Sequence, residues 1–124
     1  MCDAHAPNDK EFRKFGRPVH AVKGTKVSEV VEELKLAPDD RVILKDTYSG
    51  FYGTRLDKTL KSLGVDSLRI TGFVTHICIM LTASDAVLLD YMVTVVEDGV
   101  TGISKEEHDA ALRIMKNVMG AQIV

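Results

Sequence analysis

The sequence predicts an α/β protein with a parallel, Rossmann-like sheet flanked by helices, arranged as a three-layer sandwich. Short runs of β-forming apolar residues alternate along the chain with segments of helical periodicity, and Gly, Pro and Asp turn signals separate them. Such alternation favours parallel strands joined by right-handed crossovers. With 124 residues, 45% of them hydrophobic, the chain is long enough for a single domain over residues 1–124.

The first half of the chain contains few strong elements. Asn8 is expected to cap a short helix that ends at Gly16. Apolar residues at helical spacing predict a helix over 27–34. Pro and Asp residues at 38–40 form a turn signal, and the apolar run that follows predicts a strand over 41–45.

The middle of the chain carries the strongest signals. A helix is predicted over 54–63 with Gly64 as its stop. An apolar run then predicts a buried strand over 68–71, a turn at Gly72 and an apolar helix that begins near Thr75.

The last third adds two strands and a helix. A strand is predicted over 92–96, and Ser104 with Glu107 forms a capping box for the next helix. Gly120 ends that helix, and a closing strand is predicted over 121–124. The side chains expected to face the core from this helix are Ala111, Ile114, Met115 and Val118.

Composition and charge exclude several classes of function. With a net charge of −2, the chain lacks the excess positive charge that binding to a nucleic acid or an anionic membrane requires. No apolar run reaches the length of a membrane span and no signal peptide is recognised, so we expect a cytoplasmic protein. The two cysteines, Cys2 and Cys78, do not form a disulfide framework, which also fits a reducing compartment.

Cys78 is the residue with the clearest chemical potential. If Thr75 is the N-cap, Cys78 is the third helical residue, where unpaired amides and the helix dipole stabilise a thiolate and a developing oxyanion. Lys45 closes the predicted strand over 41–45, and parallel strands bring their carboxyl ends to one ligand-binding edge. The alternatives are a buried structural cysteine and an ordinary surface lysine.

Four segments together resemble the isochorismatase-like cysteine hydrolases, a superfamily that includes the nicotinamidases. The resemblance covers essentially the whole chain in the family's order. It rests on Gly72-Phe73-Val74-Thr75-His76-Ile77-Cys78-Ile79 with Thr82-Ala83 and Asp85-Ala86, on Lys45-Asp46-Thr47-Tyr48-Ser49-Gly50-Phe51-Tyr52-Gly53-Thr54-Arg55-Leu56, on Asp3-Ala4-His5, and on His20-Ala21-Val22-Lys23-Gly24-Thr25.

The resemblance implies roles for individual residues. Cys78 is the nucleophile and Lys45 belongs to a Cys–Asp–Lys triad, while Phe51 lines the substrate pocket. The backbone amides of Val74 and Cys78 form the oxyanion hole, next to an implied cis peptide between Phe73 and Val74. The triad Asp is implied upstream of Asp3, so we expect the chain to lack the family's N-terminal strand–helix unit.

The resemblance also implies a divalent metal, zinc in the first instance, held by Asp3, His5 and His20. One carboxylate and two imidazoles suit this ion. Ordinary loop histidines are the alternative for His5 and His20. The expected function is a nicotinamidase-type amidohydrolase, a homo-oligomer that converts a small carboxamide such as nicotinamide to its acid and ammonia.

Three other functions stay open at this point. The first is another isochorismatase-like hydrolase, acting on an enol ether, ureido or carbamoyl group. The second is a non-catalytic remnant of the fold, favoured by the absent triad Asp. The third is a redox-sensing thiol protein, which needs a resolving cysteine, and the sequence offers only Cys2.

Overall fold

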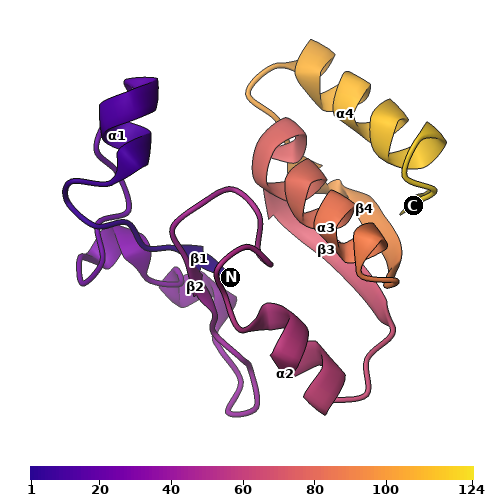
Figure 1. Cartoon of the computed structure of the whole chain (residues 1–124), viewed down its shortest axis with the longest axis horizontal. Helices are drawn as coiled ribbons and strands as arrows, with labels where there is room; N and C mark the ends of the chain where they lie inside the picture. The colour runs from indigo at the N-terminus through magenta and orange to yellow at the C-terminus, as the bar shows by residue number, and fades with distance from the viewer. The chain divides into compact units, whose positions relative to one another are not determined.

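A computed structural model describes all residues from 1 to 124. The chain forms two compact units, one of residues 1–47 and 52–54 and the other of residues 48–51 and 55–124. Both contain parallel strands, and the second alternates strands with helices, as the sequence predicts. The helices and strands are β1 Cys2–Asp3, α1 Lys10–Phe15, β2 Leu44–Lys45, α2 Leu56–Ser62, β3 Ser67–Phe73, α3 Met80–Leu88, β4 Met92–Thr101, α4 Lys105–Asn117 and β5 Gln122–Ile123 (Figure 1).

The first unit is built around a short parallel pair of strands. β1 lies beside β2 with Asp3 opposite Lys45, and the pairing continues where the Ala4 amide donates to the Lys45 carbonyl at 2.7 Å. A parallel bridge between His5 and Val22 extends the same chain segment. The strand predicted over 41–45 is shorter than expected, because only its last two residues are in register with residues of β1.

The prediction of a helix over 27–34 is wrong. Two 3₁₀ turns, Lys26–Ser28 and Glu32–Leu34, occupy this segment. Val27 is 74% exposed, so its apolar pattern has no packed surface to stabilise a helix. The hydroxyl of Ser28 also bonds the Thr25 carbonyl at 2.8 Å, which favours a local turn.

Helix α1 forms where the sequence predicts it, but its cap is one residue later. Asp9 rather than Asn8 is the N-cap, and its carboxylate accepts a hydrogen bond from the Glu11 amide at 2.9 Å. Gly16 ends the helix with a φ of 62°, a conformation that glycine adopts without steric cost.

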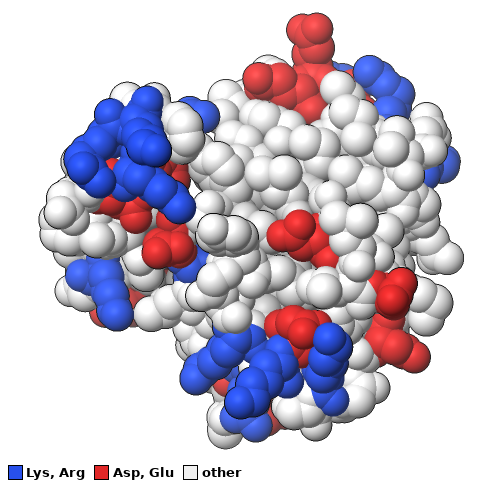
Figure 2. Space-filling view, in the orientation of Figure 1, with Lys and Arg blue, Asp and Glu red and all other residues white.

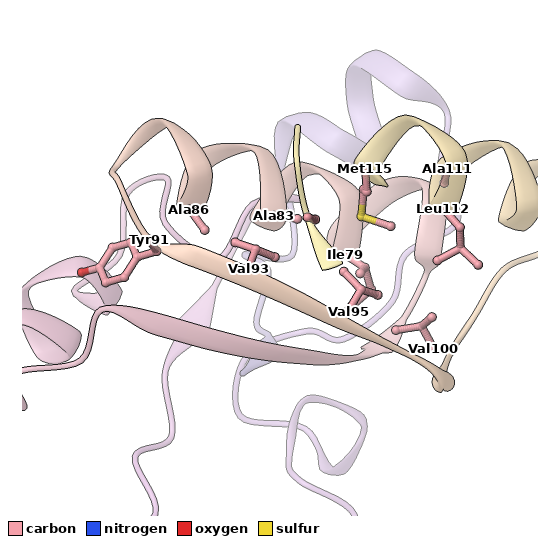
Figure 3. Packing of buried hydrophobic residues seen from close by; sticks show 11 residues of the cluster. Ile79, Ala83, Ala86, Tyr91, Val93, Val95, Val100, Ala111, Leu112 and Met115 are labelled. Carbon is pink, nitrogen blue, oxygen red and sulfur yellow. The ribbon is translucent and has the colours of Figure 1, made fainter. Parts of the chain in front are cut away.

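The second unit contains a parallel three-stranded sheet in the order β3-β4-β5. Helices α3 and α4 cover the same face of this sheet (Figures 1 and 3). β3 does not turn at Gly72 as predicted but continues to Phe73. The register between β3 and β4 shifts between Ile70 and Gly72, and Gly72, with a φ of 123°, lies at this irregularity. β4 is also longer than predicted and pairs again with β3 at Val100 and Thr101.

The hydrophobic core of the second unit joins α3, β4 and α4, as Figure 3 shows. Helix α4 contributes Met115, which is fully buried, and the buried residues Ala111 and Leu112. The expectation that Ile114 and Val118 face inward is wrong, since they are 42% and 78% exposed. The core side of the helix is centred on Ala111 and Met115, so Leu112 rather than Ile114 lies at its flank. The buried side chains of the cluster are Ile79, Ala83, Ala86, Tyr91, Val93, Val95, Val100, Ala111, Leu112, Met115 and Ala121.

Charged side chains gather over individual helices (Figure 2). Acidic side chains cover the first turn of α4, where Glu106 and Glu107 complement the positive end of the helix dipole. Ser104 caps this helix by accepting from the Glu107 amide at 3.2 Å, which confirms the predicted N-cap; the Glu107 carboxylate accepts from the Ser104 hydroxyl at 2.8 Å, so only the first half of the capping box is present. None of the helices combines the length and the apolar composition that crossing a membrane requires.

Candidate active site

Cys78 lies in a single π-helical turn, Thr75–Ile79, that connects β3 to α3. The Val74 carbonyl accepts hydrogen bonds from the amides of Ile77 and Ile79, at 3.1 and 3.2 Å, and Val74 is therefore the N-cap. The prediction that Thr75 is the N-cap is wrong, and Cys78 is the fourth helical residue rather than the third. It still belongs to the first turn, where helix amides favour an anion. π-Helical turns of this kind occur frequently at functional sites.

The strand that leads into this turn has the predicted geometry. The Phe73–Val74 peptide bond is cis, which confirms the expectation drawn from the resemblance. Val74 is buried, and Cys78 is half-buried and forms no disulfide. The structure thus places Val74 and Cys78 at the two ends of one tight strand-to-helix connection.

The glycine-rich loop before α2 is tied to the helix that follows Cys78. The Gly50 amide donates to the Thr82 hydroxyl at 2.9 Å, and the Ser49 hydroxyl donates to the Asp85 carboxylate at 2.5 Å. Thr82 and Asp85 follow Cys78 by four and seven residues, which places all three on one face of the helical segment. The loop is therefore attached to the Cys78 side of α3.

Phe51, the predicted substrate-pocket residue, belongs to this loop. Its amide donates to the Ser49 hydroxyl at 3.2 Å, and its ring lies 5.8 Å from the Tyr91 ring between centroids. The half-buried ring also packs against the hydrophobic core. Part of Phe51 thus serves the core, while its backbone is fixed next to the helix that carries Cys78.

Lys45 is buried in the first unit, with 7% of its surface exposed, so it is not an ordinary surface lysine. Its ammonium forms an ion pair with the Asp3 carboxylate and donates to the Thr47 carbonyl at 2.8 Å. A buried charge needs such partners, because desolvation of an unpaired ammonium is costly. Asp3 and Lys45 are opposite each other in the β1–β2 pair, which explains why their side chains meet.

His5 is enclosed by acidic and aromatic side chains of the same unit. Its Nδ1 lies 3.5 Å from the Asp9 carboxylate and its Nε2 lies 3.9 Å from the Glu11 carboxylate. The rings of Phe12 and His20 lie 5.3 and 4.9 Å from the His5 ring between centroids. A hydrogen bond from the Glu11 amide lowers the pKa of Asp9 below its usual value, against the opposing effect of desolvation, and His5 lowers it further.

The metal set predicted at Asp3, His5 and His20 is not assembled in this structure. No group of three or more His, Cys, Asp or Glu side chains in the chain is arranged to hold a metal ion. The physical reason lies in the partners that these donors have taken: Asp3 pairs with Lys45, and His20 Nδ1 bonds the Pro18 carbonyl at 2.8 Å. As placed, the three side chains therefore do not fit a divalent ion.

A model of the isochorismatase domain matches residues 3–124. The chain belongs to the isochorismatase family. Curated relatives of this isochorismatase-family chain include the uncharacterized family protein YaaI of Bacillus subtilis, 37% identical over 72% of the chain and 50% of the relative. A second is an Arabidopsis thaliana protein named "probable inactive nicotinamidase", 40% identical over 78% of the chain and 50% of the relative. The chain spans half the length of these two relatives.

Solved structures of family members match the fold closely. An isochorismatase-like hydrolase from Alkaliphilus metalliredigens has a TM-score of 0.91 and 36% identity, covering 98% of this chain and 65% of the other. An N-carbamoylsarcosine amidase from Thermoplasma acidophilum has a TM-score of 0.86 and 39% identity, over 98% and 68%. A pyrazinamidase of Pyrococcus horikoshii, solved in complex with zinc, has a TM-score of 0.90 and 37% identity, over 99% and 72%. These matches confirm the predicted α/β isochorismatase-like fold.

The structure also assigns contacts to residues of this family member that sequence reasoning left without a role. Thr82 and Asp85 hold the Phe51 loop, and their four- and seven-residue spacing from Cys78 is a helical signal that could have indicated this. The Thr75 hydroxyl bonds His108 of α4. No spacing rule reveals that contact, because it joins two helices that are distant in the sequence.

Proposed function

We propose that this chain is a cysteine amidohydrolase of nicotinamidase type, which hydrolyses a small carboxamide to the carboxylic acid and ammonia. The observation that carries the proposal is the position of Cys78. It lies in the first turn after β3, on the helix face to which the Phe51 loop is tied through Thr82 and Asp85. A nucleophile at the start of a helix, next to a fixed loop with an aromatic residue, suits attack on a small planar amide.

The proposed reaction has two steps: the Cys78 thiol is acylated in the first and regenerated in the second. The sulfur attacks the amide carbonyl, the carbon–nitrogen bond breaks, and the amine leaves as ammonia with the proton that the thiol has lost. The product of this half is a thioester on Cys78. Water then cleaves the thioester, which releases the acid and restores the thiol.

Three further roles belong to this proposal. Lys45 takes the part of the lysine in the proposed Cys–Asp–Lys triad, whose ammonium serves to stabilise the thiolate form of the nucleophile. The backbone amides of Val74 and Cys78 hold the oxyanion that forms on the carbonyl oxygen. Phe51 contacts the flat face of the substrate ring. What supports the role of Lys45 is that its side chain is buried and its ammonium is held in one position by the Asp3 carboxylate and the Thr47 carbonyl.

A carbamoyl or ureido compound is the second candidate substrate. The 39% identity to the N-carbamoylsarcosine amidase favours it, because that enzyme acts on a different carbon–nitrogen bond with a similar fold. The same attack by Cys78 would then release ammonia from a carbamoyl group. The name of the Arabidopsis relative supports a third candidate, a non-catalytic family member.

The test is release of ammonia from nicotinamide and from N-carbamoylsarcosine by the parent protein, the Cys78→Ala variant and the Cys2→Ala variant. We expect the parent and Cys2→Ala to release ammonia at the same rate and Cys78→Ala to release none. The preferred substrate separates the first two candidates. Equal turnover by Cys78→Ala and the parent would contradict the proposal, and an inactive parent would favour the non-catalytic candidate.

A further inference from the structure

Asp85 is an unusual residue for the middle of an apolar helix. It is the only charged residue of α3, and no basic residue lies three or four positions away along the chain to pair with it. Aspartate is also among the less favourable residues for a helix interior, because its short polar side chain competes for backbone hydrogen bonds. Neither helix propensity nor an ion pair within the helix therefore explains an aspartate at this position.

The partner of the Asp85 carboxylate lies outside its helix. The hydroxyl of Ser49, a buried residue of the glycine-rich loop before α2, donates to this carboxylate at 2.5 Å. The same hydroxyl oxygen accepts a hydrogen bond from the Phe51 amide at 3.2 Å. Ser49 thus links a carboxylate of α3 to the backbone of the residue proposed to contact the substrate ring.

The chemistry of the three groups fixes the direction of this link. A serine hydroxyl has one hydrogen to donate, and an ionised carboxylate can only accept. Asp85 therefore holds the hydroxyl hydrogen of Ser49 and leaves the lone pairs of the oxygen to the Phe51 amide. Because a hydrogen bond to a charged acceptor is stronger than one between neutral groups, the carboxylate also restricts rotation of the hydroxyl.

The Phe51 ring has a fixed neighbour of its own. Its centroid lies 5.8 Å from that of Tyr91, which is only 6% exposed. The Tyr91 hydroxyl in turn donates to the Asp57 carboxylate of α2 at 2.9 Å. Phe51 is therefore held at two points, at its ring by Tyr91 and at its amide by Ser49.

We propose that Asp85 is a positioning residue, which acts through the Ser49 hydroxyl to set the orientation of Phe51 toward the substrate. This inference rests on the proposed function, in which Phe51 contacts the substrate ring. It gives the aspartate of α3 a part in recognition of the substrate rather than in cleavage of the carbon–nitrogen bond. Its loss should therefore weaken the use of nicotinamide at low concentration more than the rate at saturation.

The test compares the parent with Asp85→Ala, Asp85→Asn, Ser49→Ala and the double variant Ser49→Ala/Asp85→Ala. Asp109→Asn is the matched control, because this carboxylate also has a side-chain partner, Lys105, but belongs to α4. The first measurement is the hydrogen-exchange rate of the Phe51 backbone amide, followed by NMR. The second is kcat and KM for nicotinamide hydrolysis. Thermal melting checks that each variant is folded, which we expect of Asp85→Ala because alanine favours a helix interior.

We expect the Phe51 amide to exchange about tenfold faster in Ser49→Ala, and faster by a smaller factor in Asp85→Ala, where the hydroxyl loses its fixed direction. KM for nicotinamide should rise by about threefold to tenfold in both variants, the effect of one lost hydrogen bond, with kcat little changed. Asp85→Asn, whose amide oxygen can still accept from Ser49, should stay near the parent, as should Asp109→Asn. In the double variant KM should be no higher than in Ser49→Ala, since Asp85 acts only through that hydroxyl.

A carboxylate that merely stabilised the fold would change the melting temperature but leave Phe51 exchange and KM at their parental values. That result in Asp85→Ala would overturn the inference, and so would a double variant in which the two single effects on KM multiply. If the parent does not hydrolyse nicotinamide, the proposed substrate is wrong, and Phe51 exchange in Asp85→Ala alone decides whether Asp85 positions this residue. The two failures are therefore distinguishable.

Discussion

Replacement of Met115 by Ala tests how helix α4 is anchored. Met115 is fully buried in the cluster that joins α3, β4 and α4 (Figure 3). Truncation of a buried methionine to alanine costs about 2–5 kcal/mol, the sum of lost transfer free energy and the cavity left behind. A domain of this size is stabilised by about 5–15 kcal/mol, so the loss is a large fraction of the total.

Ile114→Ala is the matched control, because this neighbour is on the same helix but 42% exposed. The stability of both variants is measured by urea unfolding, followed by circular dichroism at 222 nm, because the signal at this wavelength reports helix content. With an m-value of about 2 kcal/mol/M, Met115→Ala should lower the urea midpoint by about 1–2.5 M, and Ile114→Ala by clearly less. Equal shifts, or a larger shift for Ile114→Ala, would refute the assigned packing face of α4.

Two further predictions concern the charged groups. The hydrogen bond from Lys61 is the main cause that lowers the pKa of Asp57 below its usual value. This contact therefore stabilises the fold above pH about 4, and the stabilisation is lost as pH falls through the folded pKa. Asp57→Asn should flatten the acid side of a plot of unfolding free energy against pH, and an unchanged acid side would count against the contact. Zinc could bind at Asp3 only by displacing the Lys45 ammonium from its carboxylate, so Lys45→Met should bind zinc more tightly than the parent in equilibrium dialysis. His20→Ala in the Lys45→Met background is the control. Equal zinc affinity of parent and Lys45→Met would show that the ion pair does not limit metal binding.

The elements that the sequence predicted well are those whose local signals agree with their packing. The Ser104 cap fixes the start of α4 as predicted, and Gly120, with a φ of 70°, follows three residues after its end at Asn117, because caps and turns act through neighbouring backbone atoms. The helix expected over 27–34 failed for the opposite reason. Its apolar spacing had no buried surface to pack against, and helical spacing alone does not stabilise a short helix.

The candidate site shows the same division between local and long-range information. The position of Cys78 in the first helical turn follows from residues adjacent in the sequence, and it was predicted to within one residue. The ion pair of Asp3 with Lys45 joins residues far apart in the chain and was not predicted. The same holds for the bond between Thr75 and His108, since no sequence periodicity reports which helices meet.

The most direct test of the central claim is capture of the covalent intermediate on Cys78. The protein would be mixed with nicotinamide, quenched in acid within the first turnover and digested, and the Cys78 peptide would be measured by mass spectrometry. We predict that this peptide gains the mass of a nicotinoyl group in thioester linkage, that hydroxylamine removes it, and that the Cys2 peptide is unmodified. Turnover of nicotinamide without acylation of Cys78 under conditions that slow thioester hydrolysis, or acylation at another residue, would contradict the assignment of Cys78 as the nucleophile.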